Sequence, residues 1–226
     1  MAAIAPITID VVSDVVCPWC YVGSRRLEQA LAELPEIEAE VIWRPFQLDP
    51  TIPPEGRDRK EYMRGKFGSD DRIRHIHDNL IQSTLDAGIP FAFDKIKVAA
   101  NTLDAHRLIR WAGGQGQQMQ GAVVKALFKA NFEEGRYVGD HAVLTEIAAE
   151  AGMDSAVVAA LLPTDADREA VRSEIEQAQR MGISGVPCFL LERKYAVMGA
   201  QPTEALTDAI RQVATTKARG ELGAAG

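Results

Sequence analysis

Two runs of alternating apolar and polar residues flank a helical repeat near the start of the chain. Residues 7–12 (ITIDVV) alternate as a half-buried strand does, and residues 38–46 carry a similar pattern. Between them, apolar side chains recur at the spacing of one helix face: Leu27, Ala30, Leu31 and Leu34. Pro35 ends this helix. The order predicts a right-handed βαβ unit with two parallel strands.

The pattern changes after a proline-rich loop at residues 48–56. Nearly all apolar positions from Asp58 to Met181 follow helical spacing. Strand character then returns at residues 188–191 and 195–198, and the short turn between these runs favours an antiparallel hairpin. A last amphipathic helix begins at Pro202.

This order predicts an α/β fold with a helical insertion. We expect residues 1–50 and 183–218 to form one discontinuous domain around a sheet. Residues 51–182 form the inserted α-helical domain, and residues 219–226 form a flexible tail.

Composition narrows the classes of partner. The 226 residues are 46% apolar, which is enough to form a core without disulfides. The net charge is −7 and no long basic run is present, which argues against nucleic acid or an anionic membrane as a partner. Residues 1–6 (MAAIAP) lack the basic region of a secretory signal, and no apolar run is long enough to cross a bilayer. We therefore expect a cytoplasmic protein, in which thiols are kept reduced.

The candidate chemistry lies at Cys17-Pro18-Trp19-Cys20, between the first strand and the first helix. A proline is accommodated at the first position of a helix, and the positive end of the helix dipole stabilises a thiolate. The pattern indicates a dithiol redox centre. The alternative is a zinc site, but only Cys188 and four scattered histidines remain as further ligands, so we expect no metal and no other cofactor.

Several segments together resemble a known family. The Cys-Pro-Trp-Cys turn, the inserted helical block and the step Gly185-Val186-Pro187 look like the DsbA family of thioredoxin-fold oxidoreductases. Four segments are similar to its FrnE-like branch: DVVCPWCYVG from Asp14, RPFQLDP from Arg44, NTLDAHRL from Asn101 and GISGVPCF from Gly182. The resemblance covers nearly the whole chain and implies a thioredoxin-like fold with an inserted α-helical domain.

Roles for the site residues follow from the turn and from this resemblance. Cys17, at the helix end and open to solvent, is the expected nucleophile, and Cys20 is the resolving thiol. The resemblance implies that Pro187 is cis and faces the cysteine pair, where the peptide group of Val186 can hydrogen-bond an extended substrate. We expect Trp19 to be partly exposed beside the turn.

Two further side chains have open interpretations. Asp14 either shuttles a proton for Cys20 or is a turn residue that bonds the local backbone. Cys188 is either a small buried apolar residue or a third redox-active thiol.

The sequence thus predicts a thiol-disulfide oxidoreductase that reduces, oxidises or isomerises disulfides in a protein or in a low-molecular-weight thiol such as glutathione. Direction depends on the reduction potential, which spans about −270 to about −120 mV among proteins of this fold. One alternative is a glutathione-dependent isomerase of the hydroxychromene-carboxylate type, although that related branch has serine where Cys17 stands. The other is a peptide-binding or chaperone module without enzymatic activity.

Overall fold

The structure, a computed structural model, describes residues 5–222 and divides into two compact units. One contains the described residues of Met1–Phe46 and Ile175–Gly226, and the other contains Gln47–Glu174. The domain boundaries expected from the sequence, with the inserted domain at residues 51–182, stay predictions. Of the expected flexible tail, residues 223–226 lie outside the described part, and Leu222 packs against the core of the first unit.

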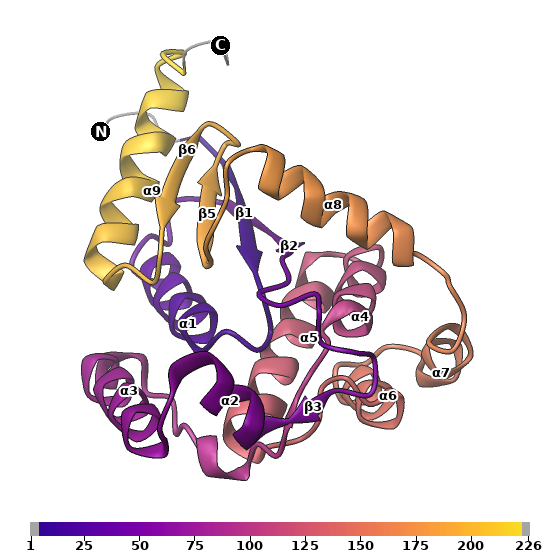
Figure 1. Ribbon diagram of the computed structural model, residues 1–226. Helices are drawn as coiled ribbons and strands as arrows, with labels where there is room; N and C mark the ends of the chain where they lie inside the picture. The colour runs from indigo at the N-terminus through magenta and orange to yellow at the C-terminus, as the bar shows by residue number, and fades with distance from the viewer. Residues whose placement is uncertain (1–4, 223–226) are drawn as a thin grey trace. The chain divides into compact units, whose positions relative to one another are not determined.

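The first unit is built on a four-stranded mixed sheet (Figure 1). Its strands lie in the order β2 (Ala39–Pro45), β1 (Ile7–Ser13), β5 (Cys188–Leu191) and β6 (Tyr195–Met198). β1 runs parallel to β2 and antiparallel to β5, and β5 pairs with β6 as an antiparallel hairpin. The predicted parallel pair and the predicted hairpin are therefore confirmed.

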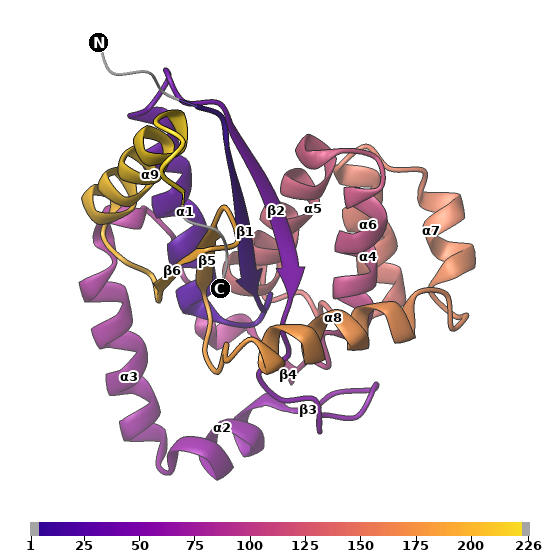
Figure 2. The same cartoon turned by 90° about the horizontal axis from the view of Figure 1, so that it is seen from above.

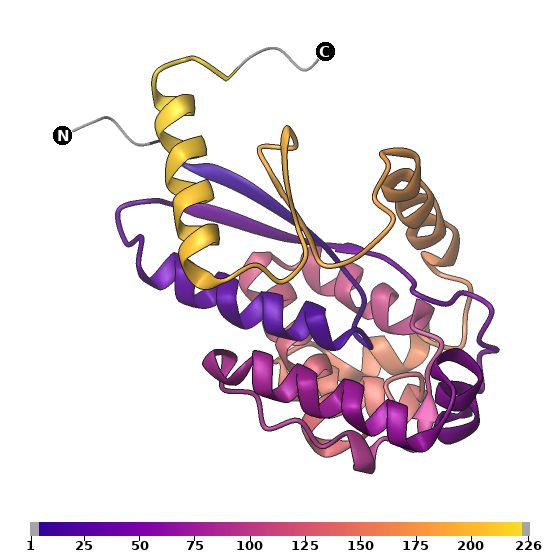
Figure 3. The same ribbon diagram turned by 60° about the vertical axis from the view of Figure 1, so that its left-hand side comes forward.

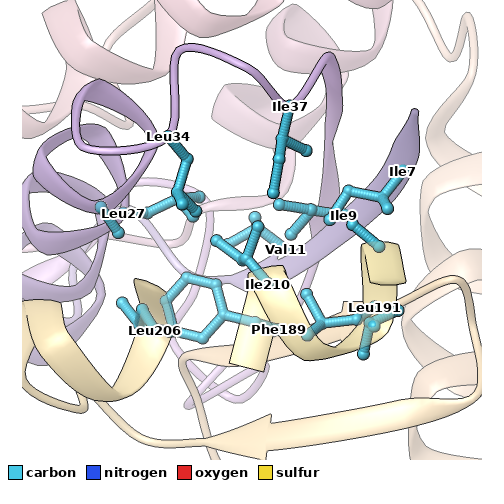
Figure 4. Close-up of a cluster of buried hydrophobic side chains, with 13 residues drawn as sticks. Ile7, Ile9, Val11, Leu27, Leu34, Ile37, Phe189, Leu191, Leu206 and Ile210 are labelled. Atoms are coloured by element: carbon cyan, nitrogen blue, oxygen red, sulfur yellow. The ribbon is translucent and has the colours of Figure 1, made fainter. Parts of the chain in front are cut away.

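Two helices, α1 (Pro18–Ala32) and α9 (Thr203–Ala218), pack side by side on one face of this sheet (Figure 3). Ile7, Ile9 and Val11 point toward the helices because side chains alternate along a strand. Figure 4 shows these side chains meeting those of the helices and of β5 in one buried cluster, which includes Leu27, Leu34, Phe189, Leu191, Leu206 and Ile210. Leu27 and Ala30 of the predicted helical repeat thus lie on the buried face of α1, and because the helix ends at Ala32, Leu34 joins the cluster from just beyond it.

A smaller cluster lies on the other face of the sheet. Val12 and Cys188 pack there with Phe46, Ile183 and Ala178, the last from the C-terminal part of α8 (Arg168–Arg180). On the same face of β1, the buried carboxylate of Asp10 accepts hydrogen bonds from Arg44 Nε at 2.6 Å and Arg193 Nε at 3.1 Å. The polar position inside an apolar strand is therefore satisfied by two guanidinium groups.

The second unit is mainly helical, as predicted. Figure 2 shows α4 (Leu103–Gly113), α5 (Gln117–Lys129) and α6 (His141–Glu150) lying side by side. The remaining elements are β3 (Arg57–Asp58), α2 (Arg59–Phe67), α3 (Asp70–Ser83), β4 (Val98–Ala99), α7 (Ser155–Leu161) and short turns at η1 (Leu85–Ala87), η2 (Phe93–Lys95) and η3 (Ala130–Glu134). Among the described residues, no helix is both long and apolar enough to traverse a lipid bilayer.

A buried arginine holds α4 to the segment after α7. Arg107 is 0% exposed, and its five N–H groups donate to four backbone carbonyls and to Asp104 Oδ1 at 2.6 to 3.0 Å. The carbonyls belong to Leu161, Leu162, Thr164 and Ala166. Because every donor is used, the buried charge is compensated, and a loop without regular structure is fixed in place.

One close approach sets the distance between α1 and the loop before β5. The Val186–Pro187 peptide bond in this loop is cis. A Cβ added to Gly23, on α1, would lie 2.9 Å from Pro187 Cγ and 3.1 Å from Phe189 Cζ. Glycine at this position therefore lets the helix touch the loop without a clash.

We expect Gly23→Ala to destabilise the protein by about 1–3 kcal/mol, because the added methyl group displaces the Pro187 ring in a packed region. Urea unfolding followed by circular dichroism measures the change. Gly65→Ala is the matched control, since Gly65 also lies in a helix but a Cβ there meets nothing within 4 Å. That control should raise stability by up to about 1 kcal/mol. Equal midpoints for the two variants would contradict the proposed close packing.

Candidate active site

The Cys-Pro-Trp-Cys turn forms the start of α1. Cys17 is the N-cap residue, with φ −90° and ψ 113°, and Pro18 is the first helical residue, as predicted. The backbone N–H of Cys20 donates to the carbonyl of Cys17 at 3.0 Å, which closes the first turn. No acidic residue lies within this first helical turn. All three cysteines are free.

The cis-proline loop lies against Cys17. Cys17 Sγ donates a hydrogen bond to the carbonyl of Val186 at 3.8 Å, across 169 positions of sequence. The N–H of Gly199 donates to the carbonyl of Pro187 at 2.8 Å, which ties the loop to the end of β6. The residues predicted to face each other, Cys17 and the Val186–Pro187 step, are therefore in contact.

The expectation that solvent reaches Cys17 freely is wrong. This residue is only 4% exposed, because its sulfur faces the Val186 carbonyl instead of water. Trp19 is 41% exposed, in agreement with its expected position at the edge of the turn. The exposed group of the turn is thus the indole ring, and the first sulfur lies beneath the loop.

Cys20 and Asp14 are both buried, with exposed fractions of 1% each. Burial raises the pKa of the Cys20 thiol well above its ordinary value, and the hydrogen bond and charge of Cys17 raise it further. The negative charge of Asp14 also raises this pKa, while a backbone hydrogen bond from Asp14 opposes the rise. Cys20 is therefore held as a neutral thiol, with a carboxylate near enough to influence its titration.

Cys188 lies immediately after the cis-proline, but it belongs to the core. It is 0% exposed, pairs with Val12 across the sheet, and packs in the small cluster of Phe46 and Ile183. Burial raises the pKa of its thiol. Its environment is that of a small apolar side chain.

Sequence reasoning did not single out Gly23. The spacing between Cys20 and Gly23 could have indicated its role, because a residue three positions after Cys20 lies on the same face of the helix. A glycine on that face, where most helices carry a larger side chain, indicates a close neighbour. Within residues 5–222, no group of three or more His, Cys, Asp or Glu residues has an arrangement that could hold a metal ion.

Solved and curated proteins resemble this chain over most of its length. A crystal structure of a probable DsbA oxidoreductase, SCO1869 from Streptomyces coelicolor, superposes with a TM-score of 0.84 at 33% identity, covering 97% of this chain and 93% of that one. The uncharacterized protein YwbO of Bacillus subtilis (strain 168) is 29% identical over 193 residues, which are 81% of this chain and 86% of that protein.

A more distant match is the cytosolic disulfide reductase DsbM from Pseudomonas aeruginosa, solved with GSH. It shares 22% identity and a TM-score of 0.59, with 94% of this chain and 99% of that chain covered, and it supports the fold alone.

The family model of the DSBA-like thioredoxin domain matches residues 8–211. This match spans both units of the chain and includes the Cys17 turn and the Val186–Pro187 loop. The chain is therefore a member of the DSBA-like thioredoxin domain family.

Proposed function

We propose that this protein is a thiol-disulfide oxidoreductase with Cys17 and Cys20 as its redox pair. The observation that carries the proposal is the contact between Cys17 Sγ and the Val186 carbonyl, at the N-terminus of α1 and beside a cis-proline. A cysteine at a helix N-terminus is activated by the helix dipole, and a neighbouring thiol can resolve a mixed disulfide.

In the reducing direction, the Cys17 thiolate attacks one sulfur of a substrate disulfide. The substrate S–S bond breaks, its other sulfur leaves as a thiolate, and a mixed disulfide forms with Cys17. The Cys20 thiolate then attacks Cys17 Sγ and releases the second substrate thiolate. The substrate gains two electrons, and the protein is left with a Cys17–Cys20 disulfide. The oxidising direction runs the same steps in reverse.

Asp14 is the proposed proton acceptor for the second step. Cys20 must lose its proton to attack, yet burial holds the pKa of its thiol high. Bulk water has little access to a thiol that is 1% exposed. The buried Asp14 carboxylate, whose charge already acts on Cys20, is the base available to take that proton.

The loop before β5 is the proposed binding element. The peptide group of Val186 can pair with an extended substrate backbone once the Cys17 thiol loses its proton and no longer donates to that carbonyl. Pro187 fixes the direction of this peptide group, and the exposed Trp19 ring offers an aromatic surface beside the turn. Pro18 restricts the backbone between the two cysteines.

The substrate class remains a protein disulfide or a low-molecular-weight thiol such as glutathione. A protein of similar fold was solved with GSH, so glutathione is one of the thiols to be tested as a substrate. We also propose a cytoplasmic location, because three cysteines are an odd number that does not suit a framework of structural disulfides. Membership of the FrnE-like branch is likewise a proposal, based on the four matching segments.

The alternatives receive less support. The isomerase branch has serine in place of Cys17, whereas this chain has both thiols of the pair. A purely peptide-binding module would not require a second buried thiol whose titration depends on the first. Cys188 is a poor third redox thiol, because an attacking sulfur must be accessible and this one is 0% exposed.

The cysteine roles predict three different outcomes in turnover of a peptide disulfide with glutathione as reductant. Cys17→Ser should lower kcat/KM at least about a thousandfold, since the attacking sulfur is lost. Cys20→Ser should accumulate a mixed disulfide that intact-mass spectrometry detects. Cys188→Ala, the matched control, should keep the rate within about twofold because the residue serves only packing. Undiminished turnover by Cys17→Ser would reject the proposed function.

The second prediction concerns the charge at Asp14. Asp14→Asn removes a negative charge that raises the pKa of Cys20, so this pKa should fall. Titration of ¹³Cβ-labelled cysteine by NMR, in a Cys17→Ser background, follows the Cys20 signal directly. In the protein with Cys17 intact, resolution of the mixed disulfide near neutral pH should slow even though the thiol is more acidic, because the proton acceptor is gone.

Glu28→Gln is the control for this experiment, since Glu28 lies on α1, the helix that carries Cys20, but its side chain is 49% exposed. It should leave the Cys20 titration unchanged. A Cys20 pKa that does not fall in Asp14→Asn shows that the carboxylate does not act on this thiol, and faster resolution at neutral pH would exclude Asp14 as the base.

A further inference from the structure

A cavity of about 300 Å³ lies within the second unit, whose residues take no part in the redox pair. The loop at residues 50–54, the start of α4 and the first turns of α8 enclose it. This volume lies at the lower limit of ordinary ligand sites, which suits a small molecule. Its walls include Ile52, Pro53, Asn101, Leu103, Arg168 and Arg172.

The loop side of the cavity is rigidly built. Asn101 Nδ2 donates to the carbonyl of Ile52 at 2.6 Å, and its Oδ1 accepts from Gln47 Nε2 at 3.2 Å and from the N–H of Leu103 at 3.0 Å. Two of the segments that resemble the family, RPFQLDP and NTLDAHRL, thus meet here through one amide. Because these bonds occupy Asn101, this residue shapes the wall and is not a reactive group.

The charges that line the cavity are predominantly positive. Asp104 already accepts from Arg107 at 2.8 Å, His141 at 2.8 Å and Arg168 at 3.3 Å, so both oxygens of its carboxylate are engaged by the protein. Arg172 differs from these groups. Its nearest carboxylate is Glu169, 4.0 Å away and 89% exposed, and within the described chain its guanidinium makes no hydrogen bond. A guanidinium fork with five available donors therefore borders the cavity.

We propose that this cavity binds a small organic carboxylate. The planar guanidinium of Arg172 matches a carboxylate in a bidentate arrangement, and Arg168 adds positive charge on the same helix. The carbon skeleton of the ligand lies against Pro53 and Leu103, which form the apolar part of the wall. The proposal does not depend on the redox chemistry, since no cysteine lines the cavity.

The test uses benzoate as the probe, with benzamide as its neutral counterpart and inorganic phosphate as a purely inorganic anion. The full-length reduced protein carries ¹³C-labelled isoleucine and leucine methyl groups, so that Ile52 and Leu103 report binding. Benzoate should shift both signals saturably, with a Kd on the order of 1 mM, as for other fragment-sized ligands. Benzamide and phosphate should bind at least about tenfold more weakly, because one lacks the charge and the other lacks the apolar ring.

Arg172→Gln should weaken benzoate binding by about tenfold or more, since a charge-assisted pair is lost. The side chain is 55% exposed and makes only a 4.0 Å contact, so the fold should not change, and an unaltered urea midpoint verifies this. Arg180→Gln is the matched control on the same helix, because Arg180 is 67% exposed, pairs with Glu176 and does not line the cavity. It should leave benzoate binding unchanged.

Each other result overturns the proposal. Benzoate that binds equally well to Arg172→Gln, or that is weakened equally by Arg180→Gln, removes the role of Arg172. If benzamide binds as tightly as benzoate, the negative charge of the ligand is not required for binding. If phosphate binds more tightly than benzoate, the cavity is a site for an inorganic anion and not for an organic carboxylate. If benzoate causes no saturable shift, the cavity is not a carboxylate site.

Discussion

The close contact between α1 and the loop before β5 is the constraint on which the proposed redox centre depends. At Gly23 the helix has no side chain, and the ring of Pro187 occupies that space. The loop can then extend over the start of the helix, where the Val186 carbonyl meets Cys17 Sγ. A larger residue at position 23 would separate the two elements, and the sulfur would lose the backbone group that faces it. One small residue, three positions after Cys20 on the same helix, therefore sets the geometry around the Cys17 turn.

Much of the fold could be predicted from local patterns. Alternation along residues 7–12 predicted β1, and the recurrence of Leu27 and Ala30 predicted the buried face of α1. The turn between β5 and β6 predicted their pairing, because a short connection permits only an antiparallel arrangement. These features depend on neighbours in sequence, and so the sequence pattern is sufficient to identify them.

Features that depend on distant partners could not be predicted in the same way. Helix position indicated that Cys17 should be accessible, but a carbonyl 169 residues away covers its sulfur. Arginine is usually a surface residue, yet Arg107 is 0% exposed. It is buried because four backbone carbonyls accept hydrogen bonds from its guanidinium group. Neither partner has a sequence signature, since every residue carries a carbonyl. Resemblance to a family placed the Val186–Pro187 step opposite the cysteine pair, but it indicated neither that Cys17 would be buried there nor the contacts of Arg107.

The burial of Cys17 Sγ beneath the Val186 carbonyl also affects how easily this sulfur is oxidised by peroxides. A thiolate that is open to solvent is oxidised by peroxides to sulfenic acid and then irreversibly to sulfinic and sulfonic acids. With 4% of the residue exposed and a carbonyl dipole against the sulfur, dissolved peroxide meets a shielded atom. A partner that aligns its own backbone with Val186 can replace that contact with hydrogen bonds along an extended strand, whereas a peroxide molecule offers only its own O–H groups. The loop that we propose as the substrate-binding element therefore also shields the sulfur between turnovers.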